Sequence, residues 1–164
     1  IMEFRGIYYF LSNFSPCKVE HQGITYPSVE HFYVAMKCNN DQMIDGVFYT
    51  IGDFRENVAK LKEAAFAKKL GQKIRVRKDW SEKKFQFMEY GLREKFKDTD
   101  LRDKLVGTGN IEIIETNLWH DVEWGQCSCD KCKNKGKNLL GKLLMKLRSE
   151  FNGTQKKGLE QLFK

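Results

Sequence analysis

Apolar residues recur every three or four positions along much of the chain, a pattern that predicts a mostly helical protein. One helix is expected from about Val29 to Cys38, with Ser28 as its N-cap. A second pattern runs from Glu56 to Leu70, where Gly71 is expected to end the helix. A third helix is expected over residues 79–96. Each would bury its apolar stripe against the others.

Short helices and strands are expected between and after these elements. Ile111–Glu115 alternates apolar and polar residues and is the clearest predicted strand. The other expected elements are a short aromatic strand ending in a turn over residues 7–14, a hairpin over residues 17–26 around His21-Gln22, an irregular stretch over residues 39–55, a short helix over residues 101–106 and a final helix over residues 139–151. The strands do not alternate regularly with helices, which argues against a doubly wound parallel sheet. We expect an α+β fold, a single compact domain that is mostly helical with a few short strands.

Length and composition set the expected domain plan. A chain of 164 residues with 41% hydrophobic and 31% charged residues suits one globular domain, expected over residues 1–151. The tail over residues 152–164 is expected to be either weakly helical or disordered. No apolar run approaches the roughly 20 residues of a membrane span, and the first residues lack the pattern of a secretion signal. We therefore expect a monomeric, cytoplasmic protein without a membrane partner.

The net charge of +7 bears on the partner. It arises from 29 Lys and Arg residues against 22 Asp and Glu residues. Such an excess favours phosphate-bearing partners, meaning nucleotides or nucleic acid. Simple solubility accounts for the same excess, so charge alone leaves the partner open.

The first segment with candidate chemistry is the predicted helix after Ser28. Glu30, Tyr33 and Lys37 are spaced three and four residues apart, so they share one helix face. A lysine whose pKa is lowered by burial can attack a carbonyl or aldehyde carbon as a neutral amine, and a neighbouring glutamate can move protons. A solvent-exposed helix edge has the same spacing, so both interpretations stay open.

A second segment, residues 117–125, places two tryptophans around an aspartate just after a predicted strand. The ring faces of Trp119 and Trp124 can stack on a base, and the Asp121 carboxylate can bind ribose hydroxyls or act as acid or base. A core tryptophan pair with a capping aspartate would give the same sequence. The spacing does not decide between the two.

A third segment, Gly136–Lys142, combines glycine, basic and amide-bearing residues, among them Asn138, at the start of the last predicted helix. Such a helix start suits a phosphate group. An ordinary helix N-terminus is the alternative.

The cysteine pattern allows a metal site. Five cysteines, an odd number, in a chain without a secretion signal argue against a disulfide framework. Cys127, Cys129 and Cys132 can bind structural zinc, with His120 or Cys38 as a fourth ligand. A reduced, exposed loop is the alternative.

The order and spacing of these segments resemble the NADAR family of N-glycosidases, whose name refers to NAD and ADP-ribose. The resemblance covers roughly residues 7–150. The matching segments are Phe10–Phe14, Tyr26–His31, Ala35–Lys37, Ala67–Gly71, Asp79-Trp80, Met88–Phe96, Leu105–Gly109, Ile113–Glu115, Trp119–Asp121, Trp124-Gly125 and Gly136–Gly141. The cysteine-rich insert between Gly125 and Gly136 departs from shorter members of the family, which have a plain loop there.

The resemblance implies a hydrolase that acts on N-glycosyl bonds. Some family members hydrolyse ribosylamino-pyrimidine phosphate intermediates of riboflavin synthesis, and others remove ADP-ribose from guanine bases of DNA. By motif match, Lys37 would attack the anomeric carbon to form a Schiff base. The expected catalytic set is Lys37, Glu30 and Asp121. The expected substrate-binding set is Asn13, Phe14, Tyr33, Trp80, Trp119, Trp124, Gly125 and Asn138.

This route requires no cofactor, because a water activated by Glu30 or Asp121 would release the sugar from the lysine adduct. Direct attack by water is the alternative route. The positive charge favours ADP-ribosylated guanine in nucleic acid as the substrate, with the riboflavin intermediates as the alternative. Two further hypotheses are a non-catalytic module that binds ADP-ribose or NAD-derived ligands, and a zinc-bound nucleic-acid adaptor built on the three cysteines.

Overall fold

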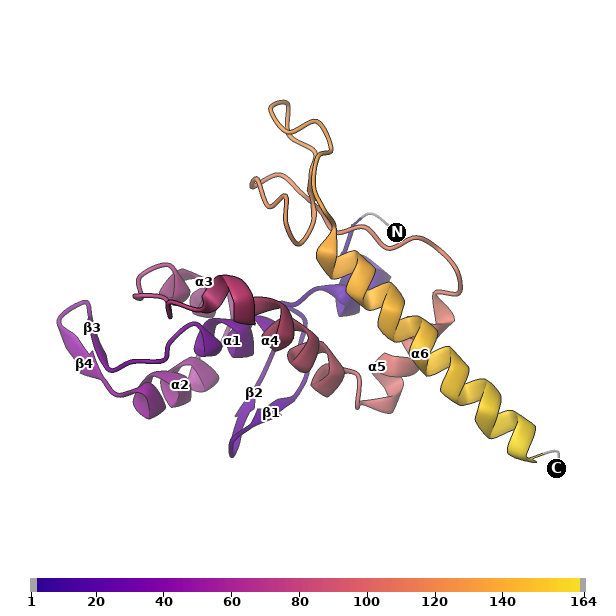
Figure 1. Ribbon diagram of the computed structural model, residues 1–164, viewed down its shortest axis with the longest axis horizontal. Helices are drawn as coiled ribbons and strands as arrows, with labels where there is room; N and C mark the ends of the chain where they lie inside the picture. The colour runs from indigo at the N-terminus through magenta and orange to yellow at the C-terminus, as the bar shows by residue number, and fades with distance from the viewer. Residues whose placement is uncertain (1–2, 163–164) are drawn as a thin grey trace. The chain divides into compact units, whose positions relative to one another are not determined.

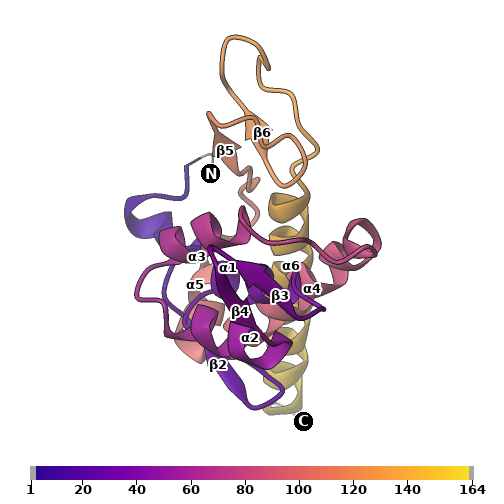
Figure 2. The same cartoon turned by 90° about the vertical axis from the view of Figure 1, so that its left-hand side faces the viewer.

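The computed structural model describes residues 3–162, and these residues fold as two compact units. The central unit is Asn13–Asp98. The terminal unit combines the N-terminal segment up to Ser12 with the chain from Thr99 onward. Each unit is described by itself (Figures 1 and 2).

The central unit is built around helix α1, Val29–Met36. Helix α1 contacts α2 (Ile51–Lys60), α3 (Ala64–Gly71) and α4 (Trp80–Lys95), as Figure 1 shows. Because α1 has neighbours on several sides, all of its residues except Glu30 are buried. The predicted helices at 29–38 and 79–96 are confirmed, although α1 ends two residues earlier than expected.

Ser28 caps α1 as the sequence predicts. Its Oγ accepts a hydrogen bond from the backbone N–H of His31 at 3.1 Å and lies 2.6 Å from the ring Nδ1 of His31. Both residues are buried, so water cannot replace the cap.

Replacement of Ser28 by alanine is expected to lower the free energy of unfolding by about 1–2 kcal/mol, because a helix N–H group loses its acceptor in a buried place. Urea denaturation measures this difference. Ser81→Ala is the matched control, since Ser81 is exposed and is not the cap of α4; it should change stability by less than about 0.5 kcal/mol. Equal losses in the two variants would contradict the capping role.

Two antiparallel hairpins complete the central unit. Strand β1 (Val19–His21) pairs with β2 (Ile24–Tyr26), with Val19 opposite Tyr26, so the predicted hairpin is confirmed, but the turn expected at His21-Gln22 is one residue too early, because His21 pairs with Ile24. The turn falls on Gln22-Gly23, where both residues have positive φ. This backbone is that of a tight two-residue hairpin turn.

The expectation of an irregular stretch over residues 39–55 is wrong. Strand β3 (Gln42–Ile44) pairs with β4 (Val47–Tyr49) through a two-residue turn at Asp45-Gly46. Both turn residues have positive φ, 51° and 79°. An Asp-Gly pair between apolar residues is a strong hairpin signal, and it was present in the sequence.

The predicted single helix over residues 56–70 is also wrong, because the chain forms two helices there. Helix α2 begins at Ile51, where Thr50 caps it by accepting from Asp53 N at 3.1 Å. The chain leaves the helical conformation at Leu61, with ψ of 134°. The Leu61 carbonyl lies 3.0 Å from Nε2 of His31, so a tertiary hydrogen bond replaces helix continuation.

The terminal unit begins with a 3₁₀-helix, η1, over Gly6–Leu11. Tyr8 N donates to Arg5 O at 3.0 Å, and Ser12 N donates to Tyr9 O at 2.9 Å. The strand expected within residues 7–14 is therefore wrong. A short apolar run does not distinguish a strand from a helical turn by periodicity alone.

Two helices that contact each other form the rest of this unit's framework: α5, Thr99–Gly107, and α6, Leu139–Leu162. Both were predicted, and α6 extends beyond residue 151 as a helix. The proposed division at 151/152 stays a prediction. Strand β5 (Thr116–Asn117) pairs in parallel with β6 (Gln126–Cys127), beyond the start of α6 in Figure 2.

The strand expected at Ile111–Glu115 is not formed, and the reason lies in side chains of α6 and of the turn before it. Asn138 donates to Ile113 O at 2.9 Å and accepts from Glu115 N at 2.9 Å. Arg148 donates to Ile111 O at 2.8 Å. These side chains take the backbone groups that a neighbouring strand would otherwise bind.

The fold class is α+β, mostly helical, with short paired strands, as predicted. Among the described residues, no helix combines the length and apolar character needed to cross a membrane.

Candidate functional site

Lys37 lies at the C-cap of α1, against two aromatic rings of the central unit. Its Nζ is 5.4 Å from the ring centre of Tyr33 and 5.8 Å from that of Trp80. The two rings are 4.8 Å apart between centres. An amine within about 6 Å of aromatic faces is favourably placed for a cation–π contact. Lys37 is half-buried, so it is not on the solvent-exposed edge that its spacing also allowed.

The surroundings of Lys37 lower its pKa below the ordinary lysine value of 10.5. Burial is the largest cause, because it disfavours the charged form. The carboxylate of Glu30 raises this pKa and the ammonium of Lys68 lowers it. A larger fraction of Lys37 is therefore a neutral, nucleophilic amine near neutral pH than of an exposed lysine.

Glu30 and the loop before α1 complete this cluster. The backbone N–H of Glu30 donates to Asn13 O at 3.0 Å, which brings Asn13 beside the first turn of α1. Phe14 follows directly, with Lys68 Nζ 5.8 Å from its ring centre. The Asn13 side chain donates to Met88 Sδ at 3.4 Å, and among the described residues nothing binds its buried Oδ1.

Trp80 is positioned by the segment that precedes α4. Arg77 N donates to Lys37 O at 2.8 Å, and the Arg77 guanidinium binds Asp79 through two hydrogen bonds of 2.6 and 3.1 Å. These hydrogen bonds hold the pKa of Asp79 below its usual value. The segment thus binds the end of α1, and Trp80 follows it into α4 with its ring stacked on Phe87 at 6.0 Å.

The structure therefore brings six of the sequence-predicted residues together in the central unit: Asn13, Phe14, Glu30, Tyr33, Lys37 and Trp80. We call these residues, with Lys68, the Lys37 cluster. The other predicted residues form a second group in the terminal unit: Trp119, Asp121, Trp124, Gly125 and Asn138.

In the second group, Asp121 organises its own loop. Its Oδ1 accepts from Glu123 N at 3.1 Å and from Trp124 N at 2.9 Å. The Asn117 side chain bonds both backbone groups of Asp121, at 2.8 and 3.1 Å. Trp119 is 60% exposed, so it is not a core residue. Asp121 thus caps a turn of its own loop, whereas the alternative of a core tryptophan pair is wrong for Trp119. The catalytic role of Asp121 stays a prediction.

Asn138 and Gly125 have structural roles where the loop meets α6. Asn138 N donates to Gly125 O at 3.2 Å, Leu139 N to Glu123 O at 3.1 Å and Leu140 N to Trp124 O at 3.0 Å. A Cβ on Gly125 would collide with the side chain and carbonyl of Glu115. Protein carbonyls already bind the N–H groups at this helix start, which favours an ordinary helix N-terminus over a phosphate site. Substrate contacts by these two residues stay a prediction.

The three clustered cysteines also lie in the terminal unit, with His120 beside them. Cys38, the other candidate for a fourth ligand, is buried in the central unit, where its Sγ donates to Asn40 O at 3.3 Å. Of the two candidates, the structure places His120 with the three thiols.

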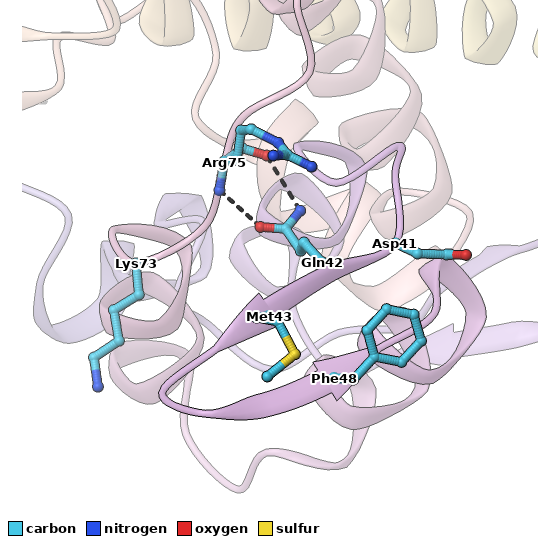
Figure 3. A pocket seen from close by; sticks show the side chains of 6 residues that line it. All are labelled: Asp41, Gln42, Met43, Phe48, Lys73 and Arg75. Carbon is cyan, nitrogen blue, oxygen red and sulfur yellow. Dashed lines mark hydrogen bonds between the residues drawn. The ribbon is translucent and has the colours of Figure 1, made fainter.

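Two open hollows lie on the central unit, with volumes of about 460 and 490 Å³, and no residue of the Lys37 cluster lines either of them. Figure 3 shows the first, where Gln42 of β3 points to the backbone of Arg75 and bonds its N–H at 2.8 Å and its carbonyl at 3.2 Å. Asp41 accepts from Ile51 N, and Lys73 pairs with Asp45 at 2.7 Å. The polar groups of this hollow are already bonded to other parts of the protein and stabilise the fold. We therefore place the functional site at Lys37.

Sequence reasoning missed two residues of the site. Lys68 entered only within the matching segment Ala67–Gly71, and Arg77 was not singled out. The Arg77-x-Asp79 pair directly before Trp80 was a readable signal for an ion pair at a helix start. Nothing in the sequence linked Lys68 to Lys37, because that proximity depends on the packing of α1 against α3.

The chain is similar to known proteins over most of its length. The NADAR domain family matches residues 3–152. A riboflavin biosynthesis protein of Vibrio vulnificus is 33% identical over 145 residues, which cover 87% of this chain; the chain spans 35% of that protein's length. N-glycosidase YbiA of Escherichia coli K12 is 31% identical over 143 residues, covering 85% of this chain and 79% of YbiA. The NMR structure of E. coli YbiA superposes with a TM-score of 0.72 at 28% identity, covering 94% of this chain and 86% of that one.

The fold is that of a small α+β protein, with a half-buried lysine at the end of its central helix. The proteins similar to it include N-glycosidases. The chain belongs to the NADAR family.

Proposed function

We propose that this chain is an N-glycosidase that hydrolyses the bond between a ribose carbon and a base nitrogen, with Lys37 as the nucleophile. The observation that carries the proposal is a half-buried amine 5.4 and 5.8 Å from the centres of two aromatic rings, with its pKa lowered mainly by burial. The N-glycosidase relatives support the hydrolase class. A module that only binds its ligand has no need of an amine in this state.

The proposed reaction has two halves. The neutral Nζ of Lys37 attacks the anomeric carbon, the bond to the base nitrogen breaks, and the Glu30 carboxylate takes a proton from the attached nitrogen and passes it to the leaving base. The sugar ring opens to an imine on Lys37. Water then adds to the imine carbon, Glu30 takes its proton and passes it to Nζ, and release of the sugar as an aldehyde restores the amine. No metal or redox cofactor enters this sequence of bonds.

The aromatic rings of the cluster suit the charge that develops in the first half. As the bond to the base breaks, positive charge builds up on the ribose. The faces of Tyr33 and Trp80 attract positive charge, and the same faces can stack on a planar base. Asp121 stays a candidate for activating water, by motif match rather than by a contact.

For the substrate, we propose ADP-ribose attached to guanine bases in nucleic acid. The support is the net charge of +7, which favours a ligand that carries several phosphates. A second candidate is a ribosylamino-pyrimidine phosphate intermediate of riboflavin synthesis, and the name of the Vibrio relative favours it.

The test incubates the full chain with ADP-ribosylated guanine DNA and, separately, with the ribosylamino-pyrimidine phosphate, each followed by mass spectrometry. Release of free ADP-ribose from DNA alone would support the first substrate, and cleavage of the pyrimidine compound alone would replace it with the second. Cleavage of neither, with binding retained, would leave the non-catalytic module.

The pH dependence of turnover should report the charges around Lys37. Activity is expected to rise as Lys37 loses its proton, with a midpoint below 10.5 because its pKa is lowered. In Glu30→Gln the charge that raises this pKa is gone, so the midpoint should move to lower pH. In Lys68→Gln the charge that lowers it is gone, so the midpoint should move to higher pH. Rate profiles of the two variants beside the wild type measure both shifts.

Lys69→Gln is the matched control, because Lys69 is an exposed lysine of the same helix α3. Its profile should coincide with that of the wild type. Shifts of Glu30→Gln and Lys68→Gln in the same direction would refute the electrostatic account. Glu30→Gln should also lower the maximal rate by about 10²-fold, through loss of proton transfer.

A further inference from the structure

The terminal unit holds a cluster of four donor atoms that the proposed reaction does not use. A nitrogen of His120 and the sulfur atoms of Cys127, Cys129 and Cys132 all lie within 4.8 Å of one another. These thiols are free of disulfides. Three sulfurs and an imidazole at one point are costly to assemble unless something binds them, because the loop between them must be ordered.

The distances fit a tetrahedral metal centre. Nδ1 of His120 is 3.4 Å from Cys132 Sγ, 3.4 Å from Cys129 Sγ and 3.9 Å from Cys127 Sγ. With Zn–S of about 2.3 Å and Zn–N of about 2.0–2.1 Å, two tetrahedral ligand atoms N and S lie about 3.6 Å apart. The observed distances lie on both sides of that value.

Hydrogen bonding alone does not explain this arrangement. Nδ1 of an imidazole carries at most one proton, and three sulfurs surround it. One proton cannot serve three acceptors at similar distances, and thiols are weak donors. A shared cation satisfies all four atoms at once.

The backbone of the loop is shaped to present the sulfurs. Cys127 N donates to Lys135 O at 2.9 Å and Asn134 N donates to Cys127 O at 2.8 Å, so the chain returns on itself. Lys133 and Asn134 both have positive φ, which makes that return tight. Cys132 N points to Cys129 Sγ at 3.4 Å, and such N–H groups orient and stabilise a thiolate ligand.

We propose that His120, Cys127, Cys129 and Cys132 bind one structural Zn²⁺ ion. Soft sulfur donors with one imidazole select zinc among the common divalent ions. Four protein ligands close the coordination sphere and leave no position for a reacting water, so the ion is structural. Binding displaces the three thiol protons to solvent, and the resulting centre carries a charge of −1. The exposed Lys131, Lys133 and Lys135 surround this charge in the sequence.

The ion would join two parts of the terminal unit. His120 belongs to the loop between β5 and β6, whereas Cys129 and Cys132 belong to the loop after β6. His120 itself has a positive φ of 66°, a left-handed conformation that histidine adopts more often than most non-glycine residues. Zinc therefore fixes the loop that carries Trp119 and Asp121.

The experiment measures metal directly and does not depend on turnover, so it can fail independently of the proposed function. The full chain is purified without chelator in reducing buffer and analysed by mass spectrometry for metals. About one zinc per chain is expected. Cobalt titrated into chelator-stripped protein should give the intense visible bands of tetrahedral cobalt and a sulfur-to-cobalt charge-transfer band. Removal of zinc should speed tryptic cleavage after Lys131 and Lys133.

Variants separate this site from loosely bound metal. Cys129→Ser and His120→Asn should lose most of the zinc, whereas Cys17→Ser, a cysteine outside the cluster, should keep it. The cobalt spectrum of the wild-type chain gives an answer even if the first two variants fail to fold. No zinc together with no tetrahedral cobalt spectrum would overturn the proposal, as would full retention of zinc by Cys129→Ser.

Discussion

Replacement of Lys37 by alanine is expected to remove turnover almost completely while leaving the fold in place. Loss of the attacking amine should lower kcat by about 10³-fold or more, because the residues that remain bind substrate but form no covalent intermediate. The fold should persist, because alanine suits a helix end and the burial of α1 depends on its other residues. Initial rates with either candidate substrate measure the change.

The adduct itself supplies the sharper evidence. Borohydride added during turnover should reduce the imine and leave the sugar attached to wild-type protein, at Lys37 in a peptide map. Lys69→Ala, an exposed lysine on α3, should react and trap like the wild type. Lys37→Arg keeps the positive charge but is not a nucleophile near neutral pH, so it should be as inactive as Lys37→Ala. A Lys37→Ala protein with more than about a tenth of the wild-type rate would instead indicate direct attack by water.

Local sequence patterns predicted most helices of this fold. Most of the predictions that failed did so because tertiary contacts determined the local structure instead. The apolar stripes of α1 and α4 could be recognised in the sequence, because the core residues of these helices recur with the helical period. The break at Leu61 was not readable, since its carbonyl binds His31, which is thirty residues distant in sequence. The missing strand at Ile111–Glu115 has a similar cause, because Asn138 and Arg148 take its backbone groups. The β3–β4 hairpin differs, since Asp45-Gly46 signalled it locally.

The sequence predicted the parts of the candidate site that lie within one motif, but not the contacts between motifs. Helical spacing placed Glu30, Tyr33 and Lys37 on one face, but did not show whether that face was exposed. Burial against Trp80 comes from another helix, and the charge of Lys68 from a third. Likewise, the cysteine spacing allowed His120 or Cys38 as a partner, and only the fold placed His120 beside the thiols.

A large loss of stability is expected from a methyl group at Gly141, in the first turn of α6. A Cβ there would lie well inside van der Waals contact of the Ile113 carbonyl oxygen and of both amide atoms of Asn138. Neither neighbour can yield freely, because Asn138 bonds Ile113 O and Glu115 N through that same amide. Gly141→Ala should therefore force the helix start away from residues 113–115. The expected loss of unfolding free energy is about 3 kcal/mol or more, from overpacking and from breaking buried hydrogen bonds.

Gly153→Ala is the matched control, because Gly153 lies in the same helix with open space around it. Alanine has the higher helix propensity, so this variant should gain about 0.5–1 kcal/mol. The two substitutions add the same methyl group to the same helix and should act in opposite directions. Urea denaturation of both variants measures the contrast. Comparable stabilities for Gly141→Ala and the wild type would mean that α6 is not held against residues 113–115, and the account of why that segment forms no strand would fail with it.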